Sequence, residues 1–489
     1  MKKSILKICF LFAATTVFSQ AGHIMQGAGA LNMSMGGAAT GNALDITGAL
    51  QWNPASISAF DENILKFDIG LFFSSPELSS SFDAGAMWPA DFFGVGSPAS
   101  PAVSGMTADD RGISPMPAFA MVWGSADSKH TFGASAIGIS GFGVTFPEEI
   151  NTPSLADGSQ NTSWDPSANS NAINYPQAAN GFGRVESDYI LLQIGFTWAY
   201  ELSDKFSIGI EPTFNYSTLQ LMPNPTAGPN DFGYPSTDKA SATGFGGQVG
   251  MYFDSGTGFS AGASYKTNIG FSDFEFANTY PDNSNATSNF NMDFPAILSF
   301  GVGYSTEIFD IAVDYRSVDY ENTEGFAESG WVIADSGPGA GFPTGEVAGF
   351  GWKNITIISA GIQYKGIDKM PLRVGYTNST NPITNELAFF SVPATAIIKN
   401  AFQFGLTYIA SDKLSLDVVY HHGASDGATT GSVLSPRPFA TDQDMNGFPD
   451  GPWSTDNLLG VIPGSEVSYE MTTDLVMVGV SFKLGGSSE

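Results

Sequence analysis

The feature that most constrains this chain is an alternation of apolar and polar side chains with a period of two residues, which begins near residue 60. In Phe206–Tyr216 the even positions carry apolar, aromatic or proline side chains, and the odd positions carry small or polar ones. This alternation indicates a β-strand whose two faces meet different environments. An all-β protein is therefore expected. The same pattern recurs in Ile190–Tyr200, Phe259–Lys266, Leu298–Tyr304, Phe309–Arg316, Ile358–Tyr364, Phe402–Tyr408, Leu414–Val418 and Val476–Leu484.

Strand ends and connections favour a transmembrane barrel over a soluble sandwich. Many of the alternating segments end in Trp or Tyr, as the aromatic girdles of membrane barrels do. Short turns such as Leu202–Lys205 alternate with long polar stretches, which is typical of periplasmic turns and outer loops. About fourteen antiparallel strands are predicted, the last pairing with the first because a free strand edge cannot face lipid. The long stretches are 76–114, 147–182, 222–242, 277–288, 323–349, 380–397 and 424–466.

The composition agrees with this prediction. Only 14% of the residues are charged, which is low for a soluble protein, whereas glycine is abundant, with 57 residues. Beyond the N-terminal segment we find no run of about 18 apolar residues, so no transmembrane helix is expected. The net charge of −29 would repel nucleic acid, which excludes it as a partner.

Residues 1–21 read as an export signal. Lys2, Lys3 and Lys7 precede the apolar run Ile8–Phe18, and a cut after Ala21 fits the small-residue rule, although a cut after Ser19 also fits it. The only cysteine of the chain lies inside this segment, so a mature chain would carry no thiol.

Residues 22–60 do not follow the strand pattern. They are rich in Gly, Ala, Asn and Met, which suits a plug packed inside a lumen, although a flexible periplasmic tail has a similar composition. We predict the plug, followed by the barrel at 61–484 and a hydrophilic tail at 485–489.

The same segment carries a resemblance to a known family. Met35-Gly36-Gly37-Ala38-Ala39, then Asp45, then Trp52-Asn53-Pro54-Ala55, resembles the N-terminal hatch of the outer-membrane long-chain fatty acid transporters. That family also includes uptake channels for toluene and related aromatic hydrocarbons. The hatch motif of this chain comprises Met35, Gly36, Gly37, Ala38, Asp45, Asn53, Pro54 and Ala55.

The resemblance implies a fourteen-stranded barrel with the hatch inside it, in the outer membrane of a Gram-negative bacterium. It also implies passive uptake: a hydrophobic compound lands in an apolar groove among the outer loops, enters the lumen and leaves sideways into the membrane through a gap at a kinked strand. A monomer is expected, and no cofactor is expected. Two alternatives remain, a structural or adhesive barrel with no transport path and an open porin for polar solutes, the second disfavoured by the plug.

Two sets of residues are candidates for this route. In the third strand, Thr131–Phe146, the alternation shifts between Ala136 and Ile137, and three glycines follow that mark either a kink or ordinary barrel curvature. These are Gly138, Gly141 and Gly143. Apolar residues beside the long loops are candidates for the outer groove or for girdle positions: Leu219, Leu221, Met222, Phe232, Tyr234, Phe274 and Phe276.

Alternation also places three cations in the lumen, Lys266, Arg316 and Arg373. They could bind a substrate carboxylate, but pairing with lumen acids such as Asp310, Asp314 or Asp417 is the better interpretation. The family's basic pocket residues have no clear match here, so the substrate is expected to be a neutral hydrophobe as readily as a fatty acid.

Two further hypotheses concern a metal and an enzyme. Asp442, Asp444, Asn446 and Asp450 have the spacing of the first ligands of a calcium loop, but Trp453 takes the place of its closing acid. A calcium site or a solvated acidic turn both fit. His421 and His422 could serve a membrane lipase, yet no nucleophile motif accompanies them, so no catalytic activity is expected.

Overall fold

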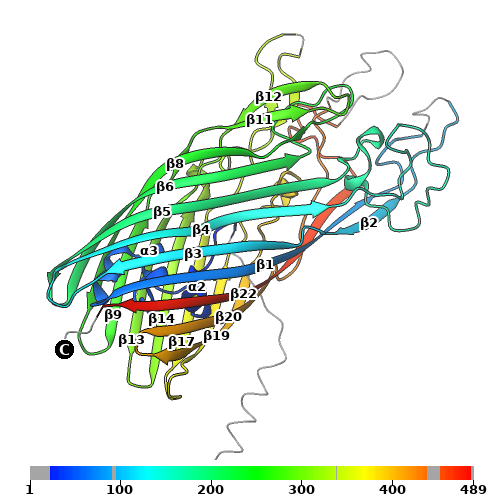
Figure 1. Ribbon diagram of the computed structural model, residues 1–489. Coiled ribbons are helices and arrows are strands. Elements are labelled where there is room, and N and C mark those ends of the chain that lie inside the picture. The colour runs from blue at the N-terminus through cyan, green and yellow to red at the C-terminus, as the bar shows by residue number, and fades with distance from the viewer. Residues whose placement is uncertain (1–21, 91–94, 338, 438–451, 486–489) are drawn as a thin grey trace, which may run out of the picture.

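The protein is a tall β-barrel, described by the computed structural model over residues 22–90, 95–337, 339–437 and 452–485 (Figure 1). Seventeen hydrogen-bonded segments make the barrel sheet, and β2, β10 and β21 continue the barrel positions of β3, β9 and β20, which leaves fourteen positions. All the pairings within it are antiparallel, as the sequence predicts. No helix in the described ranges is long and apolar enough to cross a membrane.

The barrel strands follow one another in chain order. Their bounds are β1 Asn63–Phe82, β2 Val103–Ala108, β3 Ile113–Trp123, β4 His130–Phe146, β5 Val185–Ser203, β6 Phe206–Met222, β8 Ala240–Asp254, β9 Phe259–Lys266, β10 Gly270–Phe271, β13 Ala296–Ser305, β14 Phe309–Asp319, β17 Ile355–Tyr364, β18 Leu372–Ser379, β19 Asn400–Ser411, β20 Leu414–Ala424, β21 Thr429–Gly431 and β22 Ser465–Leu484. Two small sheets lie among the long connections: β7 Ser236–Thr237 with β11 Phe274–Thr279 and β12 Asn285–Phe290, and β15 Trp331–Ile333 with β16 Pro343–Val347.

The first and last strands close the barrel. β1 pairs with β22 over its whole length, from Asn63↔Leu484 to Phe82↔Ser465. Apolar side chains on the outer face form a belt, which on β1 runs from Phe67 to Phe73. The belt continues on β13 through Leu298, Phe300, Val302 and Tyr304.

Several strands continue beyond this belt, which corrects the expectation that 76–114 is a loop. β1 extends to Phe82, and β2 lies inside the predicted loop. Above the belt the outer face of β1 is polar, with Glu77, Ser79 and Ser81, whereas Leu78 and Phe82 point inward into an apolar cluster. The strand persists because its inner face is buried even where its outer face meets water.

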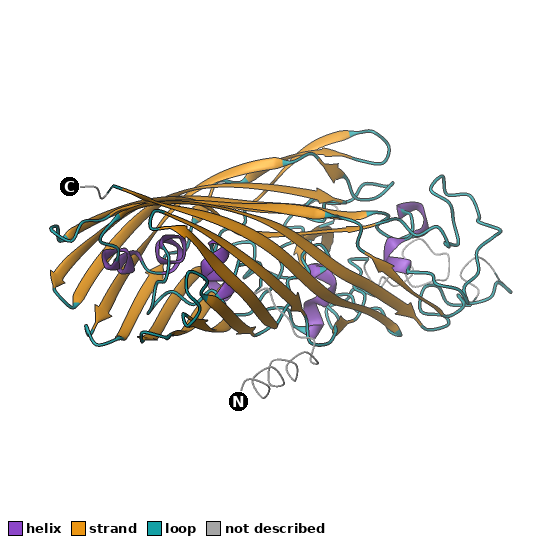
Figure 2. Cartoon of the chain, turned by 60° about the horizontal axis from the view of Figure 1, so that its bottom comes forward, coloured by secondary structure: helices purple, strands orange, loops and turns teal. Residues whose placement is uncertain are grey.

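The N-terminal segment lies inside the barrel, at the end with the short turns (Figures 1 and 2). It contains the helices α2 Gly29–Ser34 and α3 Ile46–Trp52 and the 3₁₀ helix η1 Pro54–Ala59. Asp45 caps α3 by accepting a hydrogen bond from the Gly48 N–H. Nearly all of its side chains are buried, and we call residues 22–60 the hatch. The remaining short 3₁₀ helices are η2 Ala172–Asn174, η3 Gln177–Ala179, η4 Tyr320–Asn322 and η5 Asn385–Ser391.

The largest apolar cluster fills the other half of the barrel. It joins hatch residues such as Ile24 and Trp52 to wall residues such as Ile139 and Leu191 and to residues of the long connections such as Phe390. Going up β6 from the hatch, the lumen-facing side chains change from Glu211 and Asn215 to Leu219 and Leu221. The hatch end of the lumen is therefore polar and its outer end apolar.

Candidate functional site

Arg316 fastens the hatch to the wall. Its Nη2 lies 2.6 Å from Asp314 Oδ2 and donates to the Gly37 carbonyl at 2.7 Å. Its guanidinium carbon lies 3.7 Å from the centre of the Trp52 ring, a cation–π contact. The same Asp314 oxygen accepts from the N–H groups of Ala39 and Thr40. Arg316 and Asp314 thus hold two separated stretches of the hatch.

A second anchor, built on Lys66, was missed at the sequence level. Its Nζ lies 2.8 Å from Asp45 Oδ2 in the hatch and 2.7 Å from Asp417 Oδ2 on β20. Beside it, Asp68 Oδ1 accepts from the Ala30 N–H at 2.8 Å. The alternation of β1, with Phe67 and Ile69 outside, could have placed Lys66 and Asp68 in the lumen.

The motif residues of the hatch pass close to the wall. Gly36 and Gly37 have φ of +70° and +79°, a region that favours glycine, and a Cβ on Gly36 would lie 2.6 Å from the Tyr376 carbonyl oxygen. Asn53 Nδ2 donates to the carbonyls of Thr40 and Met251, and its Oδ1 accepts from the Ala55 N–H. The Met-Gly-Gly-Ala turn and the Asn-Pro-Ala end are therefore the points where the hatch touches β18 and β8. Met35, Ala38 and Pro54 are buried.

The other two lumen cations bind wall residues. Lys266 Nζ donates to Gln193 Oε1 at 3.0 Å. Arg373 Nε donates to Gln363 Oε1 at 2.7 Å, its Nη2 donates to Thr407, and its Nη1 lies 3.9 Å from Asp417 Oδ1. Asp310 accepts from Gln363 and pairs with Lys365. Both cations belong to polar networks of the wall.

In one part of the barrel wall, the neighbouring strands β3 and β4 are not hydrogen-bonded to each other, and we call this unpaired stretch the seam. In this fully described stretch their pairing runs from Trp123↔Phe132 to Ala118↔Ile137 and stops there. Above that point β3 still pairs with β1 and β4 still pairs with β5, so only the seam between them is open. β4 has a register shift between Gly138 and Ser140, two residues beyond the shift expected from the sequence. Pro115 and Pro117 on the facing edge have no N–H for a ladder bond.

The first hatch residues cover the free edge of β4. The Gly141 N–H and the Ser140 hydroxyl both donate to the His23 carbonyl, at 3.2 and 2.9 Å, and the Met25 N–H donates to the Ile139 carbonyl at 3.1 Å. Ile24 pairs with Ser140 in an antiparallel bridge. The inner side of the seam is thus covered by hatch residues 23–25 and not by a barrel strand.

Arg111 bounds the top of the seam. Its guanidinium donates to the Ser187 carbonyl and pairs with Asp188 at 2.6 Å, while the Asp110 N–H donates to the Thr145 carbonyl. A Cβ on Gly143 would lie 1.6 Å from Arg111 Nη1. Of the three predicted kink glycines, Gly143 is therefore the one whose missing side chain makes room for a neighbour.

Next to the seam, the His23 imidazole lies in a cage of aromatic rings. The ring-centroid distances from His23 range from 4.8 to 6.5 Å, and the six rings are those of Phe142, Tyr189, Phe294, Tyr320, Phe326 and Trp352. Its Nδ1 lies 2.8 Å from the Tyr320 hydroxyl. Burial lowers the pKa of His23 to about 3, so the ring is neutral. Sequence reasoning missed this cage because its members come from segments far apart in the chain.

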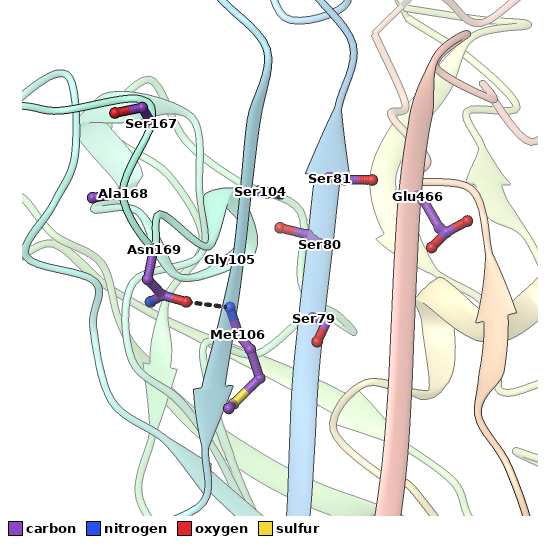
Figure 3. A pocket seen from close by; sticks show the side chains of 10 residues that line it. All are labelled: Ser79, Ser80, Ser81, Ser104, Gly105, Met106, Ser167, Ala168, Asn169 and Glu466. Atoms are coloured by element: carbon purple, nitrogen blue, oxygen red, sulfur yellow. Dashed lines mark hydrogen bonds between the residues drawn. The ribbon is translucent and has the colours of Figure 1, made fainter.

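The residues expected to form an outer groove lie partly inside. Leu219, Leu221, Phe274 and Phe276 are buried in the large apolar cluster, Met222 and Tyr234 are half-buried, and Phe232 is 60% exposed. Two open pockets lie elsewhere and are polar. One, of about 440 Å³, opens between β1, β2 and β22, where Asn169 accepts from the Met106 N–H (Figure 3). It is lined by Ser79, Ser80, Ser81, Ser104, Gly105, Met106, Ser167, Ala168, Asn169 and Glu466.

The second pocket, of about 510 Å³, lies beside Lys239 and Glu275. Hydroxyl and charged linings suit neither pocket to a hydrocarbon. Beside the hatch the lumen holds His23 and its aromatic neighbours.

Three predictions concern other positions. His421 faces the lumen and approaches Gln403, whereas His422 lies on the outer face, 2.7 Å from Asp474. The candidate calcium ligands Asp442, Asp444, Asn446 and Asp450 lie outside the described residues, as do the signal segment 1–21 and residues 486–489 of the tail. The calcium hypothesis stays a prediction.

A closed fourteen-stranded barrel with an internal hatch defines a plugged outer-membrane β-barrel. The family described as “Outer membrane protein transport protein (OMPP1/FadL/TodX)” matches residues 171–433, more than half of the sequence, and the chain belongs to this family. This membership places the protein in the outer membrane of a Gram-negative bacterium. Among curated proteins, none matches the sequence.

Solved structures share the fold at low sequence identity. The toluene transporter TodX of P. putida is 15% identical, with 94% of this chain and 99% of that chain covered and a TM-score of 0.58. A FadL homologue of Pseudomonas aeruginosa is 13% identical, with coverages of 95% and 100% and a TM-score of 0.63. The toluene transporter TbuX of Ralstonia pickettii is 13% identical, with coverages of 94% and 99% and a TM-score of 0.56.

Proposed function

We propose that the protein is a passive uptake channel for hydrophobic compounds, such as long-chain fatty acids or aromatic hydrocarbons, that releases them sideways into the outer membrane. The observation that carries the proposal is the seam between β3 and β4 above Ala118↔Ile137. Barrels in lipid normally pair every strand edge, so an unpaired stretch of wall requires an explanation. Structures of the same fold include transporters of toluene, which supports a hydrophobic cargo.

Lateral release follows from the energetics of an apolar solute. Moving such a solute from an apolar site into water costs roughly 25 cal/mol per Å² of exposed surface. A solute that leaves through the wall enters hydrocarbon and avoids this cost. The hatch blocks the axial route, because Arg316 and Lys66 fasten it across the lumen.

The route would begin among the outer connections, where Phe232 is exposed beside Tyr234. It would continue through the apolar cluster, which joins Leu219 and Phe276 to the aromatic cage. Phe142 lies both in the cage and on the shifted part of β4, so the cage borders the seam. Withdrawal of the His23 segment would open cage and seam together.

The other functions considered fit less well. A porin for polar solutes needs an open lumen, and a structural or adhesive barrel does not require an unpaired stretch in its wall. The proposed mechanism consists of binding and release, with membrane lipid and a small hydrophobic molecule as partners and no chemical step. The barrel closes within one chain, so a monomer suffices.

Uptake by cells tests the proposal. Deletion of the gene should lower the uptake of labelled oleate, dodecane or toluene, and complementation should restore it. Purified protein in liposomes should leave the swelling rate in arabinose unchanged, since the hatch blocks polar solutes. Unchanged uptake of all three hydrophobes after deletion would refute the proposal. Mass spectrometry of co-purified ligand would identify the compound class independently.

A further inference from the structure

A group of charged side chains lies on the outer face of the barrel directly above the apolar belt. On β5, Ile190 is an exposed side chain of the belt, and Asp188 is the next outward-facing residue towards the long loops. Arg111 Nη2 lies 2.6 Å from Asp188 Oδ1, and Lys239 Nζ pairs with Asp188 Oδ2. Asp188 therefore joins two cations on the outside of the wall.

A third cation lies next to this pair. Arg184 Nε lies 2.9 Å from Glu186 Oε2, and Glu186 is one outward position further along β5 than Asp188. Arg184 Nη2 also lies 3.8 Å from Asp110, the neighbour of Arg111 in the chain. The side chains of Arg184 and Lys239 remain 44% and 43% exposed, so both can bind a further anion.

The charged group lies at the height of the lipid headgroups. On the neighbouring strands β5, β6 and β8 (Figure 1), the exposed apolar side chains closest to it are Ile190, Tyr216 and Phe245. The next outward-facing residues on β6 and β8 are Thr218 and Thr243, which are polar. This change from apolar to polar side chains marks the boundary between hydrocarbon and headgroups.

The clustering is informative because cations are scarce in this protein. The chain has 19 Lys and Arg residues against 48 Asp and Glu residues. Several of these cations are buried in the lumen, as Lys66 and Arg316 are. Arg111, Arg184 and Lys239 come from three separate segments and nevertheless meet on one part of the outer wall. A site for an anionic group is the simplest reason for this arrangement.

An open hollow of about 510 Å³ adjoins Lys239. Its volume is in the range of about 300–1,000 Å³ that is common for sites of small ligands. Ser241 and Ser272 contribute hydroxyl groups to its lining, and Asp273 and Glu275 contribute carboxylates. The hollow thus presents one cation beside several groups that accept hydrogen bonds.

This mixture of groups selects among the lipids of a membrane. A headgroup that carries only a phosphate would be repelled by Asp273 and Glu275. A sugar without phosphate would offer nothing to the exposed cations. A phosphorylated sugar meets both requirements, because its phosphate binds Lys239 and its hydroxyl groups donate hydrogen bonds to the two carboxylates.

We propose that Arg184, Lys239 and the hollow beside Lys239 bind the phosphorylated sugar headgroup of a glycolipid in the outer leaflet. The phosphate binds the exposed cations, the sugar hydroxyls donate to Asp273 and Glu275, and the acyl chains lie on the belt below. The inference requires only that the barrel spans the outer membrane, so it does not depend on the cargo of the channel.

Full-length protein in a polyoxyethylene detergent tests the proposal, with bound lipid measured by native mass spectrometry. The probe is bisphosphorylated lipid A, and the comparison lipids are lipid A without its phosphates and phosphatidylglycerol, which has a phosphate but no sugar. Lipid A should bind at least tenfold more tightly than either. Equal binding of either comparison lipid would overturn the proposal, and so would displacement of lipid A by millimolar inorganic phosphate, which would indicate a site for the free anion.

Variants locate the site on the barrel. Lys239→Ala combined with Arg184→Ala should lower the affinity for lipid A about tenfold, because charge-assisted hydrogen bonds to phosphate are lost. Lys239→Arg with Arg184→Lys should retain most of the affinity, since both charges remain. Lys353→Ala is the matched control, because Lys353 is also an exposed cation paired with a glutamate, Glu321, beside β14 and β17. An unchanged affinity in the double alanine variant, or an equal loss in Lys353→Ala, would overturn the inference.

The carboxylates are tested by the selectivity for sugar. Asp273→Asn with Glu275→Gln keeps the shape of the hollow and removes the negative charge. This variant should bind phosphatidylglycerol more tightly than the wild type does, so the preference for lipid A over phosphatidylglycerol should fall. A preference that stays at the wild-type value would contradict recognition of the sugar by Asp273 and Glu275.

Discussion

Lys66 Nζ lies 2.8 Å from Asp45 Oδ2, and this contact joins the first barrel strand to the residue that caps hatch helix α3. Both side chains are buried, and Asp417 completes the group at 2.7 Å. One lysine thus links the hatch to two neighbouring regions of the wall. The hatch is held by charge as well as by packing, and its removal exposes those charges.

Replacement of Lys66 by Met should loosen the hatch. Removing one member of a buried ion pair leaves the other charge uncompensated, at a cost of about 3–5 kcal/mol. We expect a lower melting temperature and faster liposome swelling in arabinose. Lys483→Met is the matched control, because Lys483 pairs with Glu62 at an exposed site, where a pair contributes about 0–1 kcal/mol. Equal behaviour of the two variants would contradict the anchoring role of Lys66.

The kink glycines should differ in their tolerance of a methyl group. In Gly143→Ala the new Cβ would displace Arg111 and break its hydrogen bonds to Ser187 and Asp188, at a cost of about 1–3 kcal/mol. In Gly138→Ala the nearest atom to the Cβ is 3.9 Å away, so little change is expected. Thermal unfolding followed by circular dichroism checks both. A Gly138 variant as unstable as the Gly143 variant would show that curvature of the strand, and not room for Arg111, sets the requirement.

Much of the barrel wall and of the hatch can be predicted from the sequence, because the alternation of side chains along each strand records which face meets lipid and which meets the lumen. Alternation such as that of Phe206–Tyr216 reports lipid on one face and lumen on the other. The hatch motif likewise picks out Gly36, Gly37 and Asp45, although only the structure shows that Asp45 caps α3. Strand length was underestimated where β1 leaves the membrane, since Ser79 and Ser81 remove the apolar outer face while Leu78 still faces inward.

The candidate site was harder to predict, because it depends on contacts between distant segments. His23, Tyr320 and Trp352 meet only after the barrel has closed. The seam could have been predicted from Pro115 and Pro117, because a strand with these prolines lacks two of the N–H groups that pair it with its neighbours. The glycines of the facing strand locate the kink within two residues of the register shift between Gly138 and Ser140.

Arg316→Lys should weaken the attachment of the hatch while keeping the positive charge. Lysine cannot lie flat over Trp52 and also reach Asp314 and the Gly37 carbonyl, so a loss of about 1–2 kcal/mol is expected. Limited proteolysis within residues 22–60 measures the attachment. Arg373→Lys is the control, since Arg373 bonds Gln363 and Thr407 of the wall. Cleavage of the hatch should increase only in the Arg316 variant, and the reverse order would contradict the assignment.

Docking of the His23 segment should weaken in acid. The pKa of the buried ring is about 3, below the ordinary value of about 6.5, so between these values the withdrawn ring binds a proton and the docked ring does not. Docking is therefore at full strength above pH 6.5 and loses about 1.4 kcal/mol per pH unit below it. The facing hydroxyls of Tyr189 and Tyr320 keep their protons in this range. Protease sensitivity near residue 25 should rise at pH 5 in the wild type and stay constant in His23→Phe.

The central claim is that cargo leaves through the seam between β3 and β4, and a cross-link across that seam tests it most directly. Pro115→Cys with Gly141→Cys would be joined by bis-maleimides of increasing length, and Phe300→Cys with Tyr315→Cys provides the control on the fully paired strands β13 and β14. Bridging the seam should abolish most uptake of labelled hydrophobe, and reversal with a cleavable linker should restore it. Uptake that survives a complete cross-link at 115 and 141 would contradict lateral release.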